Sequence, residues 1–265
     1  MKNISTGTSH LIVTEDSNNV ITITLNNPRY LNALSEELSP YLRKILKKIN
    51  KDSNCKLLII RGAGKAFCSG GNIKKMNNFN NTSLTKNFAQ KVYALEKKQK
   101  ELTGLIYNLK IPTIAVITGA CAGAGFSLAL SCDLRIGNKN AFFISNYSKI
   151  GLSGDYGISW FLSNLLGESK CKEIMFLNNR IDSKKSLQLG LLNLLFEKNF
   201  DSLLKETITN LSTQSMTALK YIKHNIKLSK NNSLNKAFKY EAKNLIKCSQ
   251  TEEHRIAVSN FKKKK

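Results

Sequence analysis

The stretch IPTIAVITGACAGAGFSLALSCDLRIG, residues 111–137, contains an apolar strand pattern, a glycine-rich turn, a small-residue helix pattern and a second strand pattern. The same order occurs earlier in the chain. KLLIIRGAG, residues 56–64, is a short apolar run of the kind that predicts a strand covered on both faces, and a glycine pair, a helical pattern to about residue 108 and the next strand follow it. This alternation predicts an α/β fold built from stacked ββα units.

The N-terminal region has its own strand and helix signals. HLIVTEDSNNVITITLNN, residues 10–27, alternates apolar and polar residues on both sides of a turn-like segment, which predicts a β-hairpin. We expect Ser35 to cap the following helix, because Glu36 and Glu37 would lie in its first turn. The apolar stripe of that helix is Leu38, Leu42, Ile45, Leu46 and Ile49.

The C-terminal part of the chain has a different sequence pattern from the rest. From about Asp201 onward there is no strand pattern, and the sequence indicates several amphipathic helices. We therefore divide the chain into a core at residues 1–200 and a helical region at 201–265, which we expect to form an oligomer surface.

Composition limits the classes of function. The chain has 265 residues, is 42% apolar and 22% charged, and can bury a full core. Its net charge is +23, from 41 Lys and Arg against 18 Asp and Glu, so a nucleic acid or a membrane surface is one possible partner. Only six of the basic residues are Arg, and nucleic-acid contacts favour Arg, so scattered solvated lysines are the preferred interpretation. An anionic ligand that carries a nucleotide also fits this charge.

Cysteine usage and the N-terminus bear on metal sites and location. The six cysteines, at positions 55, 68, 121, 132, 171 and 248, lie in apolar contexts without C-x-x-C spacing, which indicates neither a zinc site nor a disulfide framework. MKNISTGTSH lacks the apolar run of a signal peptide, and no stretch approaches the ~20 apolar residues of a membrane span. We expect a soluble, cytoplasmic protein that binds neither a metal nor a membrane.

Two glycine-rich turns indicate the chemistry. FCSGGNIKKM, residues 67–76, and GACAGAGFSLAL, residues 119–130, each follow an apolar strand. A helix that begins at such a turn exposes unpaired N–H groups with partial positive charge. A lone turn is better explained by close packing, but two convergent N–H donors stabilise the negative charge that develops on a thioester or ester oxygen.

Four segments together resemble the crotonase superfamily, the enoyl-CoA hydratase/isomerase family: NNPRYLNALS (26–35), GAGKAFCSGGNIKKM (62–76), TGACAGAGFSLALSCDLRIG (118–137) and RIDSKKSLQLGLLNLLF (180–196). The resemblance runs from about residue 11 to the end. It implies a crotonase-like spiral of ββα units with a helical C-terminal trimerisation region, a homotrimer or a hexamer, and an acyl-CoA thioester substrate. It implies no cofactor, since coenzyme A is part of the substrate.

The resemblance also assigns roles to residues of the two turns. The N–H groups of Gly71 and Ala124 would form the oxyanion hole that holds the thioester carbonyl. The stretch from Ala66 to Lys74 would wrap the adenine and pantetheine of the substrate. The substrate-binding residues on it are Ala66, Ser69, Gly70, Asn72, Ile73 and Lys74. Candidates for the CoA phosphates are Lys65, Lys74, Arg29 and the C-terminal lysine run, although for any single lysine a solvated surface charge is the preferred interpretation.

The acid and base residues depart from the hydratase pattern. Typical hydratases of the family carry two glutamates, and Ser127 and Tyr147 stand at those positions, where they would face the acyl pocket. Asp155, in KIGLSGDYGISW, is the nearest carboxylate, and isomerases of the superfamily place their catalytic carboxylate in this loop. Its apolar setting would raise its pKa toward the working range. The alternative is that Asp155 has a structural role, as a residue that favours a turn between Gly154 and Gly157.

The leading hypothesis is an acyl-CoA enzyme that shifts a 3-enoyl-CoA double bond to 2-enoyl-CoA with Asp155 as its base. One alternative is hydration of an unusual 2-enoyl-CoA, with water held by Asp155 and by Ser127 or Tyr147. An alternative of another class is a non-catalytic family member that binds RNA, which only the net charge supports. We expect no nucleic-acid partner, because both glycine turns are intact.

Overall fold

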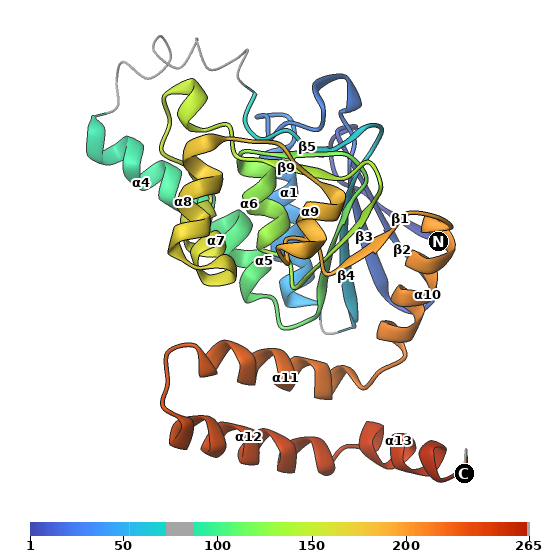
Figure 1. Ribbon diagram of the computed structural model, residues 1–265. Coiled ribbons are helices and arrows are strands. Elements are labelled where there is room, and N and C mark those ends of the chain that lie inside the picture. The colour runs from blue at the N-terminus through green and yellow to red at the C-terminus, as the bar shows by residue number, and fades with distance from the viewer. Residues whose placement is uncertain (53, 73–86, 264–265) are drawn as a thin grey trace.

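The computed structural model describes residues 1–52, 54–72 and 87–263. Two β-sheets and the helices around them form a core, from which a helical arm extends at the C-terminus (Figure 1). The arm consists of α11 (Met216–Ser229), α12 (Leu234–Ser249) and α13 (Glu252–Lys263). Ile73, Lys74 and the last two lysines, to which the sequence assigned roles, lie outside the described residues.

The larger sheet has seven strands in the order β1-β2-β3-β4-β6-β8-β11. They are β1 (Lys2–Ile4), β2 (Leu11–Glu15), β3 (Val20–Leu25), β4 (Leu57–Gly62), β6 (Thr113–Ile117), β8 (Leu134–Asn138) and β11 (Leu194–Phe196). β2 and β3 pair antiparallel, which confirms the predicted hairpin, and every pair from β3 to β11 is parallel. All residues of β4 except Arg61 are buried, as predicted for a strand covered on both faces.

The smaller sheet has four strands in the order β10-β9-β7-β5. They are β10 (Ile181–Asp182), β9 (Phe142–Ile144), β7 (Ala120–Ala122) and β5 (Ala66–Cys68). The chain places β4, β6 and β8 in the larger sheet, and the next strand after each of them, β5, β7 and β9, in the smaller one. A helix follows each of these strand pairs. This is the predicted spiral of ββα units, and it brings the ends of β5 and β7 side by side.

The helices of the core cover both sheets (Figure 1). They are α1 (Ser39–Lys51), α4 (Phe88–Gln99), α5 (Leu105–Asn108), α6 (Ala124–Leu130), α7 (Ile158–Leu166), α8 (Glu168–Leu177), α9 (Ser183–Gln188) and α10 (Phe200–Ser212). A π-helical segment of five residues, Lys100–Gly104, joins α4 to α5, so the predicted helical pattern to residue 108 is confirmed. Short 3-10 turns occur at Pro28–Tyr30 and Ser148–Ile150.

The predicted start of the first helix is wrong. α1 begins at Ser39, and Ser35 lies in the preceding turn, where its carbonyl accepts the N–H groups of Leu38 and Ser39. Within the described residues, the buried Ser35 hydroxyl has no hydrogen-bond partner. The reason is Pro40, which has no N–H to satisfy and therefore favours the first turn of a helix. The apolar stripe itself is confirmed, since all of its residues are buried.

The main core lies between the two sheets and the helices. Phe67, Phe126 and Phe143, from β5, α6 and β9, are fully buried, and the rings of Phe126 and Phe143 lie 4.8 Å apart. A smaller cluster on the other face of the larger sheet packs against Leu204 of α10. The elements that carry both glycine turns therefore share one packed core.

The segment after Phe200 is helical, as predicted. Along the arm, many large apolar side chains are exposed, among them Phe238 of α12 and Phe261 of α13. Of the residues that the structure describes, none belongs to a helix with the length and apolar character needed to cross a membrane.

Candidate active site

The two glycine turns touch each other. Gly70 has φ +91°, and a Cβ atom at this position would lie 2.9 Å from the Ala122 carbonyl oxygen and 3.1 Å from the Ala124 nitrogen. Only glycine permits this backbone to approach so closely. The contact brings Gly71, the next residue, to the start of α6.

Both candidate N–H donors are held by the backbone. Ala124 is the first residue of α6, so its N–H has no intrahelical acceptor. Gly71 forms an isolated parallel bridge with Leu34, whose N–H donates to the Gly70 carbonyl at 2.7 Å. At Gly125, an added Cβ would lie 2.2 Å from the Cys68 carbonyl oxygen, which shows how tightly α6 packs against β5. The position of each turn thus depends on main-chain contacts.

A carboxylate lies beside the second turn. The Tyr147 hydroxyl donates to Asp155 Oδ1 at 2.7 Å, and the Ser127 hydroxyl donates to the Asp155 main-chain carbonyl at 3.0 Å. A Cβ atom built on Gly123 would lie 4.0 Å from Tyr147 Cζ. The structure therefore brings Asp155, Tyr147 and Ser127 together with the glycine turns, although they come from three different elements.

Two opposing effects act on the pKa of Asp155. Partial burial raises the pKa of this carboxyl above its ordinary value, and the weaker effect of the Tyr147 hydrogen bond lowers it. The pKa of Tyr147 is raised well above its ordinary value, chiefly by burial and further by the negative charge of Asp155. Tyr147 is thus a neutral donor at physiological pH, next to a carboxylate that takes up a proton more readily than an exposed aspartate.

Comparison with known proteins agrees with this geometry. The family model for enoyl-CoA hydratase/isomerase matches residues 15–265. The chain belongs to the enoyl-CoA hydratase/isomerase family. A 1,2-epoxyphenylacetyl-CoA isomerase of Escherichia coli K12 is 27% identical over 243 residues, which cover 91% of each chain. A short-chain-enoyl-CoA hydratase of Clostridium acetobutylicum is 28% identical over 258 residues, covering 96% of this chain and 95% of that protein.

The fold matches as well. The solved structure of an enoyl-CoA hydratase from Bacillus anthracis has a TM-score of 0.86 and 25% identity, and the match covers 97% of each chain. The protein is therefore an enzyme of the crotonase fold, of the hydratase or isomerase kind. Since the relatives include both kinds, the choice of reaction depends on the residues of this chain.

In this enoyl-CoA hydratase/isomerase, the loop that carries Asp155 has an anchor that the sequence did not indicate. Tyr156 has φ +50°, a left-handed conformation that costs a bulky residue about 1–3 kcal/mol. Its carbonyl accepts a hydrogen bond of 2.9 Å from the buried Thr103 hydroxyl, 53 residues away in the π-helical segment. A single threonine inside a helical pattern carries no signal for such a contact.

Asn32 is, after Thr103, a second residue to which the sequence assigned no role. Its side chain is fully buried, and its amide nitrogen donates to the carbonyls of Ala63 and Ala66 at 2.9 and 2.8 Å. Its side-chain oxygen accepts the N–H of Asn27 at 2.8 Å. Asn32 thus ties the 3-10 turn to the start of β5, directly before the first glycine turn. Its segment contributed to the family resemblance, but the pattern gave this residue no role.

The residues expected to hold coenzyme A lie around the first turn. Ala66 is buried in β5, and Ser69 is half-buried with its hydroxyl donating to the Tyr30 carbonyl at 3.3 Å. Asn72 is half-buried, while Lys65 and Arg29 are exposed. Their contacts with a substrate stay predictions.

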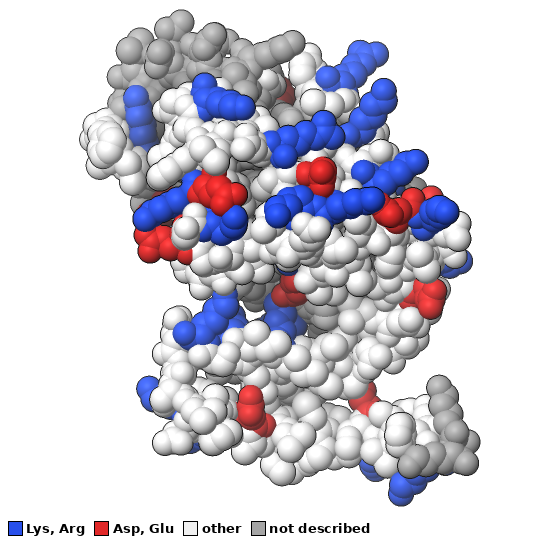
Figure 2. Space-filling model, in the orientation of Figure 1, with Lys and Arg blue, Asp and Glu red and all other residues white. Residues whose placement is uncertain are grey.

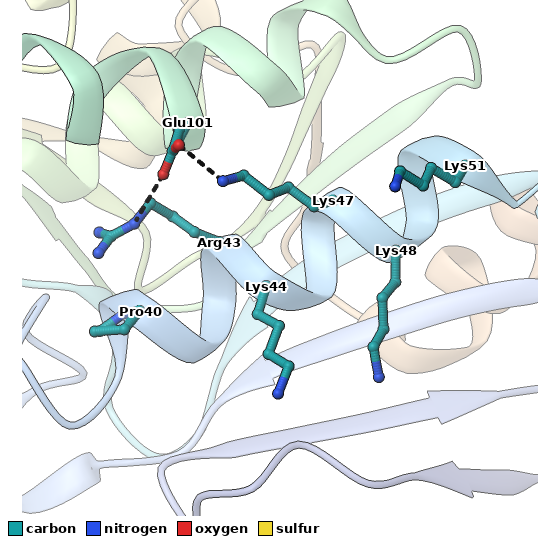
Figure 3. A pocket seen from close by; sticks show the side chains of 7 residues that line it. All are labelled: Pro40, Arg43, Lys44, Lys47, Lys48, Lys51 and Glu101. Atoms are coloured by element: carbon teal, nitrogen blue, oxygen red, sulfur yellow. Dashed lines mark ion pairs between the residues drawn. The ribbon is translucent and has the colours of Figure 1, made fainter.

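A separate hollow lies along α1 and is lined mainly by basic residues (Figure 3). It is lined by Pro40, Arg43, Lys44, Lys47, Lys48, Lys51 and Glu101. Lys47 Nζ lies 2.7 Å and Arg43 Nε 3.8 Å from the Glu101 carboxylate, and the Lys47 contact lowers the pKa of Glu101. Lys44 and Lys48 point away from Glu101. Because this carboxylate is held ionised by two cations, it is poorly suited to proton transfer.

Proposed function

We propose that this enzyme shifts the double bond of a 3-enoyl-CoA to give 2-enoyl-CoA, with Asp155 as the base. The observation that supports this proposal is a single carboxylate beside the paired glycine turns, that of Asp155, which accepts a hydrogen bond from the Tyr147 hydroxyl. The main-chain carbonyl of the same residue accepts one from the Ser127 hydroxyl. Within the described residues, Asp155 is the only carboxylate that we place at the site. A reaction that needs one proton shuttle fits it better than one that needs two acidic groups.

The proposed reaction moves one proton and leaves the composition of the substrate unchanged. The N–H groups of Gly71 and Ala124 donate hydrogen bonds to the thioester oxygen, and Asp155 removes a proton from C2. The electron pair of that C–H bond forms a dienolate, whose negative charge on the oxygen the two N–H groups stabilise. Protonated Asp155 then returns the proton at C4, and the double bond lies between C2 and C3.

The two hydroxyl groups support isomerisation rather than hydration. Ser127 donates to the Asp155 carbonyl, and Tyr147 donates to the Asp155 carboxylate. A phenol whose pKa is raised well above its ordinary value cannot serve as a second base that activates water. We propose that Tyr147 instead holds one carboxylate oxygen and leaves the other free for the proton.

We further propose that the acyl-CoA lies along the segment from Ala66 to Lys74, that no cofactor is needed, and that the enzyme works in the cytoplasm. The exposed apolar side chains of the arm support assembly into a homotrimer or hexamer. In this proposal, residues 201–265 form the assembly region and residues 1–200 carry the site.

The test offers the purified enzyme 3-enoyl-CoA and 2-enoyl-CoA separately and follows the absorbance of the conjugated thioester. We expect the absorbance to rise with 3-enoyl-CoA and to stay constant with 2-enoyl-CoA. Asp155→Asn should reduce isomerisation by roughly 10²- to 10⁴-fold while substrate binding persists. Asp201→Asn, which changes an exposed carboxylate of α10, should leave the rate unchanged.

Two outcomes contradict the proposal. Loss of the 2-enoyl absorbance without any isomerisation would identify a hydratase. Tight RNA binding at physiological salt, together with acyl-CoA activities that Asp155→Asn does not alter, would favour the non-catalytic alternative.

A further inference from the structure

A second cavity, of about 420 Å³, lies between the core and the arm. It is lined by Tyr107, Asn108, Leu109, Lys110, Lys220, Tyr221, Lys223, His224, Lys227, Tyr240, Lys243, Asn244 and Lys247. Figure 2 shows the hollow between the core and the arm, with basic side chains beside it. Of the described residues that line the cavity, six are lysines and none is Asp or Glu.

The arm helices have an unusual distribution of polarity. Lys220, Lys223 and Lys227 are spaced to share one face of α11, and Lys243 and Lys247 share one face of α12. Several large apolar residues lie elsewhere on these helices and are exposed, among them Ile222, Ile226, Leu245 and Ile246. Paired helices ordinarily turn apolar faces toward each other and toward the core. Here, lysines of both arm helices line the cavity.

The positive charge in the cavity is poorly neutralised. Among the described residues, only Lys223 of the six lysines forms an ion pair, with Asp133 at 2.7 Å. The ammonium groups of Lys220 and Lys247 each lie 5.6 Å from the centroid of the Tyr221 ring. Burial, together with the charge of Lys223, lowers the pKa of Lys227. Lys223 and Lys227 on α11, and Lys243 and Lys247 on α12, are like charges four residues apart on one helix, a spacing that is destabilising and that a bound anion would relieve.

The walls of the cavity are tied together by polar contacts. The buried amide nitrogen of Asn244, on α12, lies 2.6 Å from Asn225 Oδ1 and 3.3 Å from His224 Nδ1, both on α11. Lys223 Nζ also donates to the Ile111 carbonyl of the core at 3.0 Å. These contacts hold the lysines in place without occupying Lys220, Lys243 or Lys247.

We propose that this cavity binds a small anion that carries two or more phosphate groups, of the size of a nucleoside triphosphate. The lysine ammonium groups supply charge and hydrogen bonds for phosphates. The rings of Tyr221 and Tyr240 suit stacking of an attached base. The volume falls within the usual range for small-molecule sites, and the concave shape selects a small ligand over an extended polymer.

The cavity is separate from the site at Asp155. Asp133, which pairs with Lys223, lies beyond the C-terminal end of α6, whereas Ala124 begins that helix. A helix of seven residues is about 10 Å long. The second site therefore lies at the opposite end of α6 from the glycine turns, and it does not depend on which acyl-CoA reaction the enzyme performs.

The test is isothermal titration calorimetry, in which the full-length protein, in its native assembly, is titrated with ATP and with inorganic tripolyphosphate. We expect both to bind, and binding to weaken as salt is added. A triple variant, Lys220→Gln, Lys243→Gln and Lys247→Gln, should lose roughly tenfold or more in affinity. The matched control changes the same number of exposed lysines outside the cavity: Lys205→Gln, Lys236→Gln and Lys239→Gln. The control should bind like the wild type.

The other possible binding results either support or overturn the proposed anion site. Tighter binding of ATP than of tripolyphosphate supports a base contact, and equal binding assigns the site to the phosphates alone. Absence of binding at millimolar ligand, or equal affinity of the cavity variant and the control, overturns the proposal. So does competition by acyl-CoA together with a raised KM for acyl-CoA in the cavity variant, since the cavity would then belong to the substrate site. Circular dichroism shows whether the variants are folded.

Discussion

The hydrogen bond from Tyr147 to Asp155 sets the protonation behaviour of the proposed base. The bond stabilises the carboxylate and so lowers its pKa against the larger effect of burial. Tyr147→Phe should therefore raise the pKa of Asp155 further. Because the base acts when ionised, the rise of kcat/KM with pH should move to higher pH. A pH profile measures this, with the exposed Tyr93→Phe as control, and a shift to lower pH contradicts the proposed contact.

Asp155 also affects stability. Its pKa is higher in the folded protein than its ordinary value of 3.8, so the folded state binds the proton more tightly than the unfolded state. Stability is then greatest below the ordinary pKa and falls as pH rises through the raised value. Asp155→Asn should consequently melt at a higher temperature than the wild type at neutral pH. Thermal unfolding should show this difference shrinking as the pH approaches 3.8. A difference independent of pH would contradict this account.

At the scale of single elements, the π-helical segment positions the loop of Asp155. The Thr103 hydroxyl is the anchor for the left-handed Tyr156. Thr103→Val should lower the free energy of unfolding by about 1 kcal/mol, since one buried hydrogen bond is lost. We expect kcat to fall several-fold with KM unchanged. Thr103→Ser keeps the hydroxyl and should restore kcat, and equal kcat in the Val and Ser variants would show that the anchor is unimportant.

The close packing of α6 against β5 also depends on a single residue, Gly125. In Gly125→Ala, the new Cβ would lie 2.2 Å from the Cys68 carbonyl oxygen and force the glycine turns apart. The variant should lose about 1–3 kcal/mol of stability and most of its activity. Gly104→Ala is the control, because its nearest contact would be an ordinary 3.5 Å and alanine favours helix. Chemical denaturation and the isomerase assay test both variants, and an active, stable Gly125→Ala would refute the close contact.

At the scale of the whole molecule, the arm exposes apolar residues that a solitary chain would leave in water. Leu245 and Ile246 are 69% and 57% exposed. We expect light scattering to give the mass of a trimer or a hexamer, and Leu245→Glu with Ile246→Lys to give a smaller species. Lys239→Glu, at an exposed position on the same helix, should keep the wild-type mass. A wild-type protein that is fully active as a monomer would contradict the proposed assembly.

Most of the architecture followed from local features of the sequence. The hairpin, the buried strand β4, the ββα alternation and the helical C-terminal region are confirmed, because the period of apolar residues and the places of glycine are properties of short segments. The start of α1 was predicted wrongly, since Pro40 outweighed the capping signal of Ser35. The motif positions Gly70, Ala124, Tyr147 and Asp155 were also identifiable in advance, and the structure brings them together.

The family resemblance, the fold class and the candidate residues could all be inferred from short segments of the sequence. The tertiary structure was needed to show that Tyr147 donates to Asp155, that Thr103 anchors the Asp155 loop, and that Asn32 ties the 3-10 turn to β5. It likewise decided that lysines of two arm helices share one cavity with the core. Most of these residues lie far apart along the chain. A hydrogen bond across 53 residues, or a cavity between separate helices, depends on how packed elements are placed, and no local pattern of residues encodes that placement.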